Sequence, residues 1–218
     1  MKQDIVILFD LDGTLIDSTD AIIESFYHSF KELNFKFKGD TDDIKNEIGY
    51  PLDIMYETLG VPKEKVWDFV DSYKQYYRKI SQKKTYLLPN ATQTIKLASS
   101  FARLGIVTTK TTAYTIPLLE NFGIYEYFET IIGRQEVKNP KPHPEPILKA
   151  LDQLDQKPNQ NIYMIGDTKL DLIAASKAGI NSVGVLCGYG NYNDLVQYSN
   201  NIVTDSLEAV KLIQKCYF

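Results

Sequence analysis

The sequence predicts an α/β protein built on a Rossmann-like, doubly wound parallel sheet, with an all-helical segment inserted after the first strand. Three observations support this prediction. The chain opens with a short apolar run, residues 16–83 have helical periodicity, and strand-like and helix-like stretches alternate over the rest. Strands that alternate with helices of about 10 to 15 residues are typical of a parallel sheet covered on both faces.

The opening run, residues 4–9 (DIVILF), is apolar at every position after Asp4. A strand that faces water on one side alternates apolar and polar residues, whereas a strand buried on both faces is apolar throughout. We therefore expect residues 4–9 to form a buried parallel strand.

Residues 16–83 are predicted to form an all-helical insertion. Near its start, apolar residues recur at helical spacing behind an N-cap at Asp17 or Ser18. These apolar residues are Ile22, Ile23, Phe26, Phe30 and Leu33. Residues 41–80 are also predicted to be helical, with breaks at residues 49–51 and 60–62, where glycine and proline occur. The aromatic residues of the insertion are expected to form its core rather than a cage for a ligand.

From a return linker that begins near residue 81, the pattern becomes one of alternating helices and strands. Helices are predicted near residues 90–101, 112–122, 144–154 and 169–178, with a last one from about residue 206. The first four precede the strand-like stretches LGIVTT, YFETIIG, NIYMIGD and SVGVLCG. We therefore assign residues 1–15 and 84–218 to a Rossmann-like core domain and residues 16–83 to the inserted helical domain.

Composition excludes several classes of protein. The net charge of −4 and the pI of about 5.3 give no basic surface of the kind that binds nucleic acids. The two cysteines, Cys187 and Cys216, lie far apart and are expected to be reduced thiols in a cytoplasmic protein. No run of about 18 apolar residues is present, so we expect no membrane span.

Polar residues collect where the predicted strands end. Ligands of open α/β sheets bind at the carboxyl ends of the strands, so these residues are expected to converge on one crevice. They are Asp10 and Asp12 after the first strand, Thr108, Thr109 and Lys110 after LGIV, Lys141 in a later loop, and Asp167 and Asp171 after NIYMIG.

This set of residues suits the handling of a phosphate group. Clustered carboxylates bind a hard cation such as Mg²⁺, and a phosphate dianion needs such a cation beside an aspartate. Lys141 and the hydroxyl of Thr108 can hold phosphoryl oxygens. Two neighbouring aspartates can divide the remaining work, since one can stay ionised as a nucleophile while the other carries a proton for the leaving group.

Four stretches, in order, resemble the motifs of the haloacid dehalogenase superfamily. They are DLDGTLIDS, IVTTK, KPHPEP and GDTKLD. Two longer stretches, NEIGYPLDIMYETLG and AASKAGINSVGVLCGYGN, are similar to the phosphoglycolate phosphatase-like branch, which includes bacterial pyrophosphatases. The resemblance covers nearly the whole chain. It implies that the helical insertion is the mobile cap domain of this branch.

The resemblance also implies a role for each candidate residue. Asp10 corresponds to the nucleophile that forms an aspartyl-phosphate, and Asp12 to the general acid/base. Thr108, Thr109 and Lys141 are expected to bind the substrate, and Lys141 to take part in catalysis by neutralising charge. Asp10, the backbone carbonyl of Asp12 and Asp167 are the expected Mg²⁺ ligands, with Asp171 supporting the metal site.

For three of the candidate site residues, an interpretation without a catalytic or binding role is also open. Lys141 could be a solvated loop lysine, and Asp171 could only cap its helix or form a salt bridge on it. Lys110 could face either the site or the solvent. In the insertion, any of four basic residues could meet an anionic leaving group, and the sequence does not indicate which one does. They are Lys36, Lys38, Lys45 and Arg78.

The expected activity is Mg²⁺-dependent hydrolysis of a small phosphorylated metabolite by a monomer or homodimer. Inorganic pyrophosphatase and sugar phosphomutase remain alternatives within the same fold, although relatives that are mutases often have Val where this chain has Thr14. A dehalogenase is less favoured, because it needs no metal and this chain has both Asp12 and Asp167. The alternative outside enzymes is a signalling module that uses aspartyl phosphorylation. Cys187 stands where many relatives have Trp.

Overall fold

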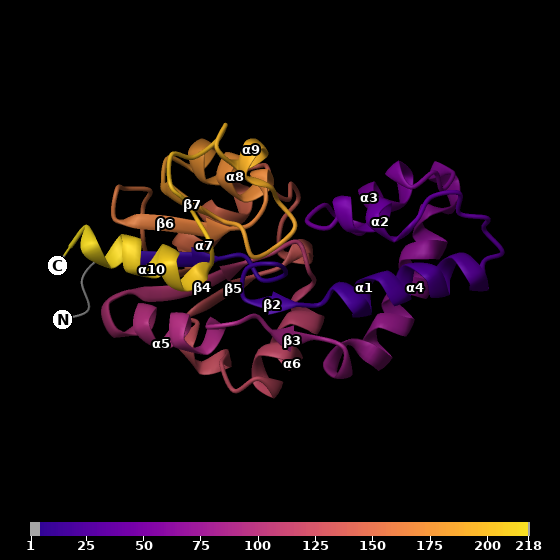
Figure 1. Ribbon diagram of the computed structural model, residues 1–218, viewed down its shortest axis with the longest axis horizontal. Helices are drawn as coiled ribbons and strands as arrows, with labels where there is room; N and C mark the ends of the chain where they lie inside the picture. Colours follow the sequence, from indigo (N-terminus) through magenta and orange to yellow (C-terminus); the bar gives the residue numbers. More distant parts are fainter. Residues whose placement is uncertain (1–4, 218) are drawn as a thin grey trace. The chain divides into compact units, whose positions relative to one another are not determined.

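The computed structural model describes residues 5–217, so Asp4 of the predicted first strand lies outside the described residues. The chain divides into two compact units (Figure 1). One, the core unit, comprises Met1–Asp17 and Leu87–Phe218, and the other, the helical unit, comprises Ser18–Tyr86. The helical unit begins two residues after, and ends three residues after, the predicted insertion of residues 16–83.

Within the described residues, the core unit contains a six-stranded sheet with the order β5-β4-β1-β6-β7-β8. Every neighbouring pair in it is parallel. The strands are β1 (Val6–Phe9), β4 (Arg103–Val107), β5 (Thr130–Ile132), β6 (Ile162–Gly166), β7 (Asn181–Val185) and β8 (Ile202–Val203). The predicted α/β class with a parallel sheet is therefore confirmed. The two-residue edge strand β8 was not predicted, because so short a segment has no periodicity to detect.

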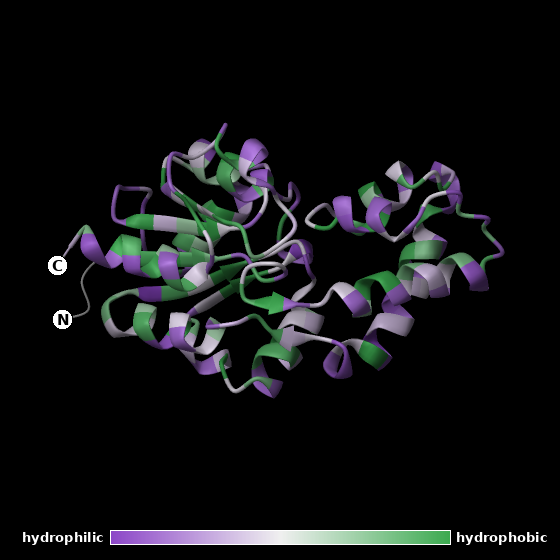
Figure 2. Cartoon of the chain, viewed as in Figure 1, coloured by the Kyte–Doolittle hydropathy of each residue, from purple (hydrophilic) through white to green (hydrophobic). Residues whose placement is uncertain are grey.

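Both faces of this sheet are covered by helices, which explains why β1 is apolar at every position. Ile7 and Phe9 belong to one buried cluster with residues of α5 (Ala91–Phe101), α6 (Thr112–Asn121) and α10 (Ser206–Lys215). Val6 and Leu8 belong to a second cluster with residues of α7 (Glu145–Gln153) and α8 (Lys169–Ala178). The hydrophobic colouring of the strands in Figure 2 follows this burial. The core unit also contains a short helix, α9 (Tyr192–Leu195).

The helical unit has an aromatic core. Its helices are α1 (Thr19–Glu32), α2 (Thr41–Asn46), α3 (Leu52–Thr58) and α4 (Val66–Ile80). The ring of Phe26 lies 4.5 Å from that of Tyr56 and 5.1 Å from that of Tyr73, measured between centroids. The prediction of an aromatic core is wrong for Trp67, which is 61% exposed, and for Tyr27, which is 41% exposed. Leu33, the last residue of the predicted apolar face, is the C-cap of α1 and is 37% exposed.

Short elements flank the helical unit. Strands β2 (Ile16–Asp17) and β3 (Tyr86–Leu87) form a two-stranded sheet, so the segment predicted to be all-helical from residue 16 begins with an extended pair. Ser18, one of the two predicted N-caps, is the N-cap of α1. Among residues 5–217, none of the helices has the length and apolar character that a membrane span requires.

Candidate active site

The site begins with the register of three adjacent strands. Phe9 at the end of β1 pairs with Ile106 of β4 and with Ile165 of β6. The ladder continues one residue further, because the Asp10 N–H donates to the carbonyl of Ile165 at 2.9 Å. Parallel strands in register end at the same edge of the sheet. The residues that follow β1, β4 and β6 (Asp10, Thr108 and Asp167) therefore lie together, as the sequence pattern predicts.

Three carboxylates come together at this edge. Asp10, Asp167 and Asp171 are buried, and each offers an oxygen that lies within 4.8 Å of those of the other two. The pKa of Asp10 is raised to about 7, chiefly by burial and also by the charge of Asp171, against the attraction of the Lys141 ammonium. The pKa of Asp167 is raised well above its ordinary value by burial and by the charges of Asp10 and Asp171.

Lys141 is the cation at the centre of this cluster. Its Nζ lies 2.9 Å from Oδ1 of Asp10, donates to the carbonyl of Val107 at 3.0 Å, and pairs with Oδ1 of Asp171. Although burial alone lowers the pKa of Lys141, the charges of Asp10 and Asp171 raise it above its ordinary value. The interpretation of Lys141 as a solvated loop residue is wrong, because the residue is 3% exposed.

Asp171 has two duties at once. Its Oδ2 accepts hydrogen bonds from the backbone N–H of Thr168 at 3.1 Å and from the Thr168 hydroxyl at 2.7 Å, which completes a capping box at the start of α8. Its Oδ1 pairs with Lys141. Both carboxylate oxygens thus have partners within the protein. These contacts indicate that Asp171 acts on the site indirectly, by holding the ammonium group of Lys141.

Asp167 is enclosed by two loops. Its Oδ1 accepts from the Thr14 hydroxyl at 3.0 Å, and its Oδ2 accepts from the backbone N–H of Tyr189 at 2.8 Å. A Cβ at Gly188 would lie 2.1 Å from Oδ2 of Asp167, and a Cβ at Gly13, whose φ is +82°, would lie 2.3 Å from the same atom. Only glycine permits this approach. These supports were not predicted, although the glycines around Tyr189 are a visible signal.

Asp12 pairs with a second lysine. Nζ of Lys110 lies 3.2 Å from Oδ1 of Asp12, and the two side chains are 8% and 13% exposed. Lys110 therefore faces the site, which the sequence left open. The buried hydroxyl of Thr108 accepts from the backbone N–H of Lys110 at 3.1 Å. Thr109, between them, is partly buried.

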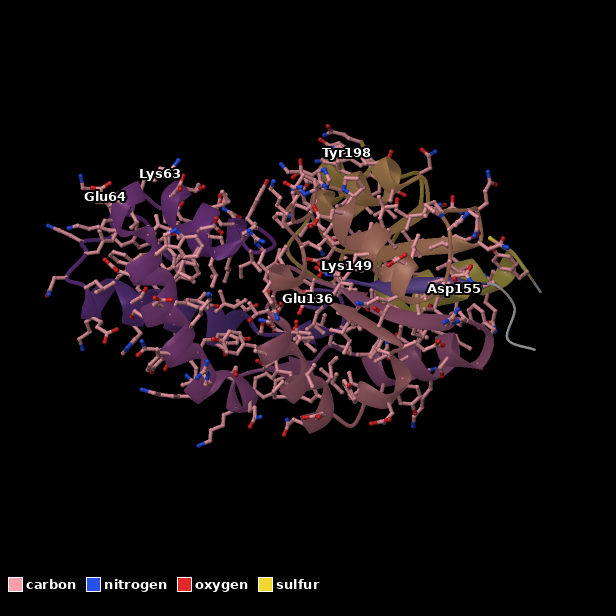
Figure 3. The ribbon with its side chains drawn as sticks, turned by 180° about the vertical axis from the view of Figure 1, so that it is seen from behind. Lys63, Glu64, Glu136, Lys149, Asp155 and Tyr198 are labelled. Atoms are coloured by element: carbon pink, nitrogen blue, oxygen red, sulfur yellow. The ribbon has the colours of Figure 1, made fainter. Side chains whose placement is uncertain are left out.

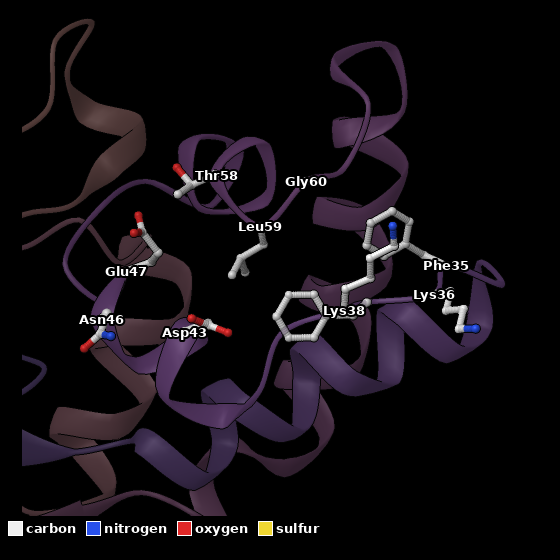
Figure 4. A pocket seen from close by; sticks show the side chains of 10 residues that line it. Phe35, Lys36, Lys38, Asp43, Asn46, Glu47, Thr58, Leu59 and Gly60 are labelled. Atoms are coloured by element: carbon white, nitrogen blue, oxygen red, sulfur yellow. The ribbon is translucent and has the colours of Figure 1, made fainter.

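A separate cavity lies in the helical unit. Figure 4 shows it between the segment after α1 and the ends of α2 and α3. Its volume is about 580 Å³, and its charged lining side chains are Lys36, Lys38, Asp43 and Glu47. It includes two of the four basic residues that the sequence suggested for an anionic leaving group, and none of the residues predicted to be catalytic.

The donor set of the core unit fits a divalent cation. Hard cations take carboxylate oxygens, and the pKa values of Asp10 and Asp167 are raised by burial and by the charges of the neighbouring carboxylates, both of which a bound cation would offset. Of the three, Asp171 is the most fully engaged within the protein, because one oxygen accepts two hydrogen bonds from Thr168 and the other pairs with the Lys141 ammonium. Each oxygen of Asp167 accepts from only one neutral donor among the contacts described above, so Asp10 and Asp167 are better placed to accept a cation.

Comparison with known proteins gives a consistent result. A family model described as haloacid dehalogenase-like hydrolase matches residues 7–185. The phosphoglycolate phosphatase of Salmonella typhi is 32% identical over 92% of this chain and 88% of its own length. That of Escherichia coli K12 is 31% identical over 88% and 85%, respectively.

Solved structures agree. A haloacid dehalogenase-like family hydrolase from Streptococcus pneumoniae superposes with a TM-score of 0.86 at 32% identity, covering 98% of this chain and 100% of that one. A predicted phosphoglycolate phosphatase from Haemophilus somnus gives a TM-score of 0.86 at 27% identity, covering 97% and 99%. These findings confirm the resemblance found in the motifs. The chain belongs to the haloacid dehalogenase-like hydrolase family.

Proposed function

We propose that this protein is a Mg²⁺-dependent phosphatase that hydrolyses a small phosphorylated metabolite in the cytoplasm, in the manner of a phosphoglycolate phosphatase. The observation that carries the proposal is the buried pairing of Asp10 with Lys141, beside Asp167. A carboxylate held by an ammonium in a largely water-free site is suited to attack a phosphoryl group. The names of the Salmonella and Escherichia coli relatives point to the same class of substrate.

In the proposed reaction, an oxygen of Asp10 attacks phosphorus, and the bond from phosphorus to the leaving oxygen breaks. Asp12 gives its proton to that oxygen, and the freed alcohol or acid departs. Asp12 then takes a proton from a water molecule, which attacks the aspartyl-phosphate. The bond between phosphorus and Asp10 breaks, and inorganic phosphate leaves. This division of labour requires one ionised and one protonated carboxyl group.

Other residues hold the phosphoryl group. Lys141 offsets negative charge on Asp10 and on the phosphoryl oxygens, and the hydroxyls of Thr108 and Thr109 donate to those oxygens. Mg²⁺ bound by Asp10, Asp167 and the backbone carbonyl of Asp12 would neutralise charge between the phosphate and Asp10. Asp171 supports the site by holding Lys141.

A turnover screen over phosphorylated metabolites, with and without Mg²⁺, tests the proposal directly. Release of inorganic phosphate from small phosphate esters supports it, whereas preferential release from pyrophosphate favours the pyrophosphatase alternative. Conversion of a sugar phosphate to its isomer without phosphate release indicates a mutase. A phosphorylated Asp10 that persists for hours, with no turnover of any compound, indicates a signalling module and contradicts the proposal.

Removal of the metal is expected to silence the enzyme. Chelation with EDTA should abolish turnover, added Mg²⁺ should restore it, and Ca²⁺ should inhibit. The physical reason is that Mg²⁺ demands tight octahedral geometry, whereas Ca²⁺ accepts more oxygens and looser contacts, so that Asp10 can bind it through both oxygens and lose its line of attack. Phosphate release measured by a coupled assay gives the result. Full activity after exhaustive chelation would contradict the proposed site.

We propose further that Ser18–Tyr86 acts as the mobile cap that the resemblance implies. A cap that closes during turnover excludes water and favours compact substrates. We therefore expect kcat/KM for 2-phosphoglycolate to exceed that for a folded phosphoprotein by about 100-fold or more, since binding energy remote from the phosphoryl group is realised only by a substrate that the cap can enclose. Equal values for the two substrates would count against the cap.

A further inference from the structure

Lys110 is the second lysine of the site, with a side chain that is 8% exposed, and neither the motifs nor the proposed reaction assigns it a task. It follows β4 in the core unit, and its Nζ lies 3.2 Å from Oδ1 of Asp12. The first buried lysine, Lys141, lies against Asp10. The two ammonium groups are therefore divided between the two aspartates, one beside the proposed nucleophile and one beside the proposed acid.

The backbone that carries Lys110 is fixed from both sides. Its N–H donates to the Thr108 hydroxyl at 3.1 Å, and its carbonyl accepts from the N–H of Arg134 at 3.1 Å. At Gly133 an added Cβ would lie 2.7 Å from that same carbonyl oxygen. The loop after β4 is thus pressed directly against the turn at residues 133–136, with no room for a side chain between them.

Glu136 accepts further hydrogen bonds that hold the turn at residues 133–136 against the loop after β4. Its Oε2 accepts from the N–H of Gly133 at 2.8 Å, and its Oε1 accepts from the hydroxyl of Thr112. Its carbonyl accepts from Nζ of Lys149, and Figure 3 shows these two residues close together. So many contacts around one short loop hold the Cα of Lys110 in place, so little backbone entropy remains to be lost when its side chain contacts a substrate.

We propose that Lys110 is a specificity-determining residue that selects substrates whose leaving group carries an anionic group close to the scissile oxygen. This inference rests on the proposed function, in which Asp12 protonates that oxygen. A proton donor lies about 3 Å from its acceptor, so Nζ of Lys110 lies within about 6 Å of the leaving oxygen when Oδ1 of Asp12 carries the proton. A carboxylate or phosphate joined to that oxygen through one or two bonds extends about 2.5 Å toward Nζ, which brings it into hydrogen-bond range.

The chemistry of the ammonium suits this task. An ammonium group has three donors in a tetrahedral arrangement, so contact with Asp12 is compatible with contact to a second anion. Because Lys110 is 8% exposed, few water molecules screen its charge from a bound leaving group. A neutral leaving group at the same place does not offset the charge of the ammonium and accepts only weaker hydrogen bonds from it, which disfavours that substrate. Lys110 is thus expected to favour substrates with an anionic leaving group and to disfavour those with a neutral one.

The test compares two substrates of nearly equal shape, 2-phosphoglycolate and its neutral amide, 2-phosphoglycolamide. The wild type is expected to prefer the carboxylate. Lys110→Met should lower kcat/KM for 2-phosphoglycolate by about 10- to 100-fold, chiefly through KM, and lower that for the amide less than about threefold. Lys110→Arg should retain most of the preference. Lys177→Met, at an exposed lysine of α8, is the matched control and should change neither value.

Hydrolysis of p-nitrophenyl phosphate distinguishes a failure of the proposed function from a failure of the role assigned to Lys110. If the wild type hydrolyses no phosphate ester, the proposed function itself fails and this inference fails with it. If p-nitrophenyl phosphate is hydrolysed but the wild type shows no preference for the carboxylate, Lys110 does not select for charge. Equal losses on both substrates in Lys110→Met, with an unchanged circular dichroism spectrum, would show that Lys110 acts only through Asp12 and would overturn the inference.

Discussion

Asp10→Asn is expected to abolish turnover while leaving the fold intact. The amide has nearly the same shape as the carboxylate, so packing at the end of β1 should be preserved. It is neither a useful nucleophile nor a good ligand for a hard cation, so both proposed duties of Asp10 are lost together. Burial and the neighbouring carboxylates raise the pKa of Asp10 to about 7 in spite of its pairing with Lys141, so its neutralisation relieves a net unfavourable charge. We therefore expect the free energy of unfolding, measured without metal, to be unchanged or higher.

Steady-state phosphate release and thermal unfolding of the same preparation provide the two measurements. Asp152→Asn, an exposed aspartate on α7, is the matched control and should retain wild-type turnover. Turnover of Asp10→Asn near the wild-type rate would remove Asp10 from the nucleophile role. A mass increase corresponding to one phosphoryl group, found on the wild type after rapid quenching and absent from the variant, would support that role independently.

Lys141→Ala is expected to lower kcat by roughly 10²–10³, the usual effect of losing one buried electrostatic partner of a transition state. The ammonium touches Asp10 and Asp171, so its removal leaves two buried carboxylates without their shared cation. Lys110→Ala should have the smaller effect, because Lys110 contacts the proposed acid and not the nucleophile. The comparison uses kcat with 2-phosphoglycolate at saturating Mg²⁺.

Loss of Lys141 also removes a buried ion pair, which is expected to destabilise the fold. Thermal unfolding of both alanine variants therefore accompanies the kinetics, and Lys141→Met, which retains the bulk of the aliphatic chain, separates loss of charge from loss of packing. If Lys110→Ala is the more damaged enzyme while both variants remain folded, the roles of the two lysines have been assigned in the wrong order.

The parallel sheet was predictable because one physical pattern determines it. A run such as residues 6–9, apolar at every position, requires cover on both faces, and the alternation of helices and strands supplies that cover. Once the strands are parallel, the residues that follow them must share an edge. Asp10, Thr108 and Asp167 could be grouped on this argument without any knowledge of side-chain positions.

Other features depend on contacts that no local pattern contains. Lys110 is compatible with either a buried or a solvated position, and the turn at residues 133–136 that fixes it lies more than 20 residues away along the chain. Asp171 could be predicted to cap α8 or to pair with a cation, but not to do both. Residue type predicts a core position for Trp67, yet it is exposed, because the buried face of α4 runs through Val66, Phe69 and Val70 and leaves Trp67 on the polar side.

The buried carboxylate cluster links the free energy of unfolding of this protein to the binding of its ligands. Keeping Asp10, Asp167 and Asp171 side by side around one lysine costs free energy that a protein selected for stability alone would avoid. Anything that neutralises the cluster in the native state, and not in the unfolded chain, returns part of that free energy as stability. In the proposed metal-dependent reaction, the resistance of the protein to unfolding is thereby linked to the supply of the cation, so we expect scarcity of the ion to weaken the fold as well as the reaction.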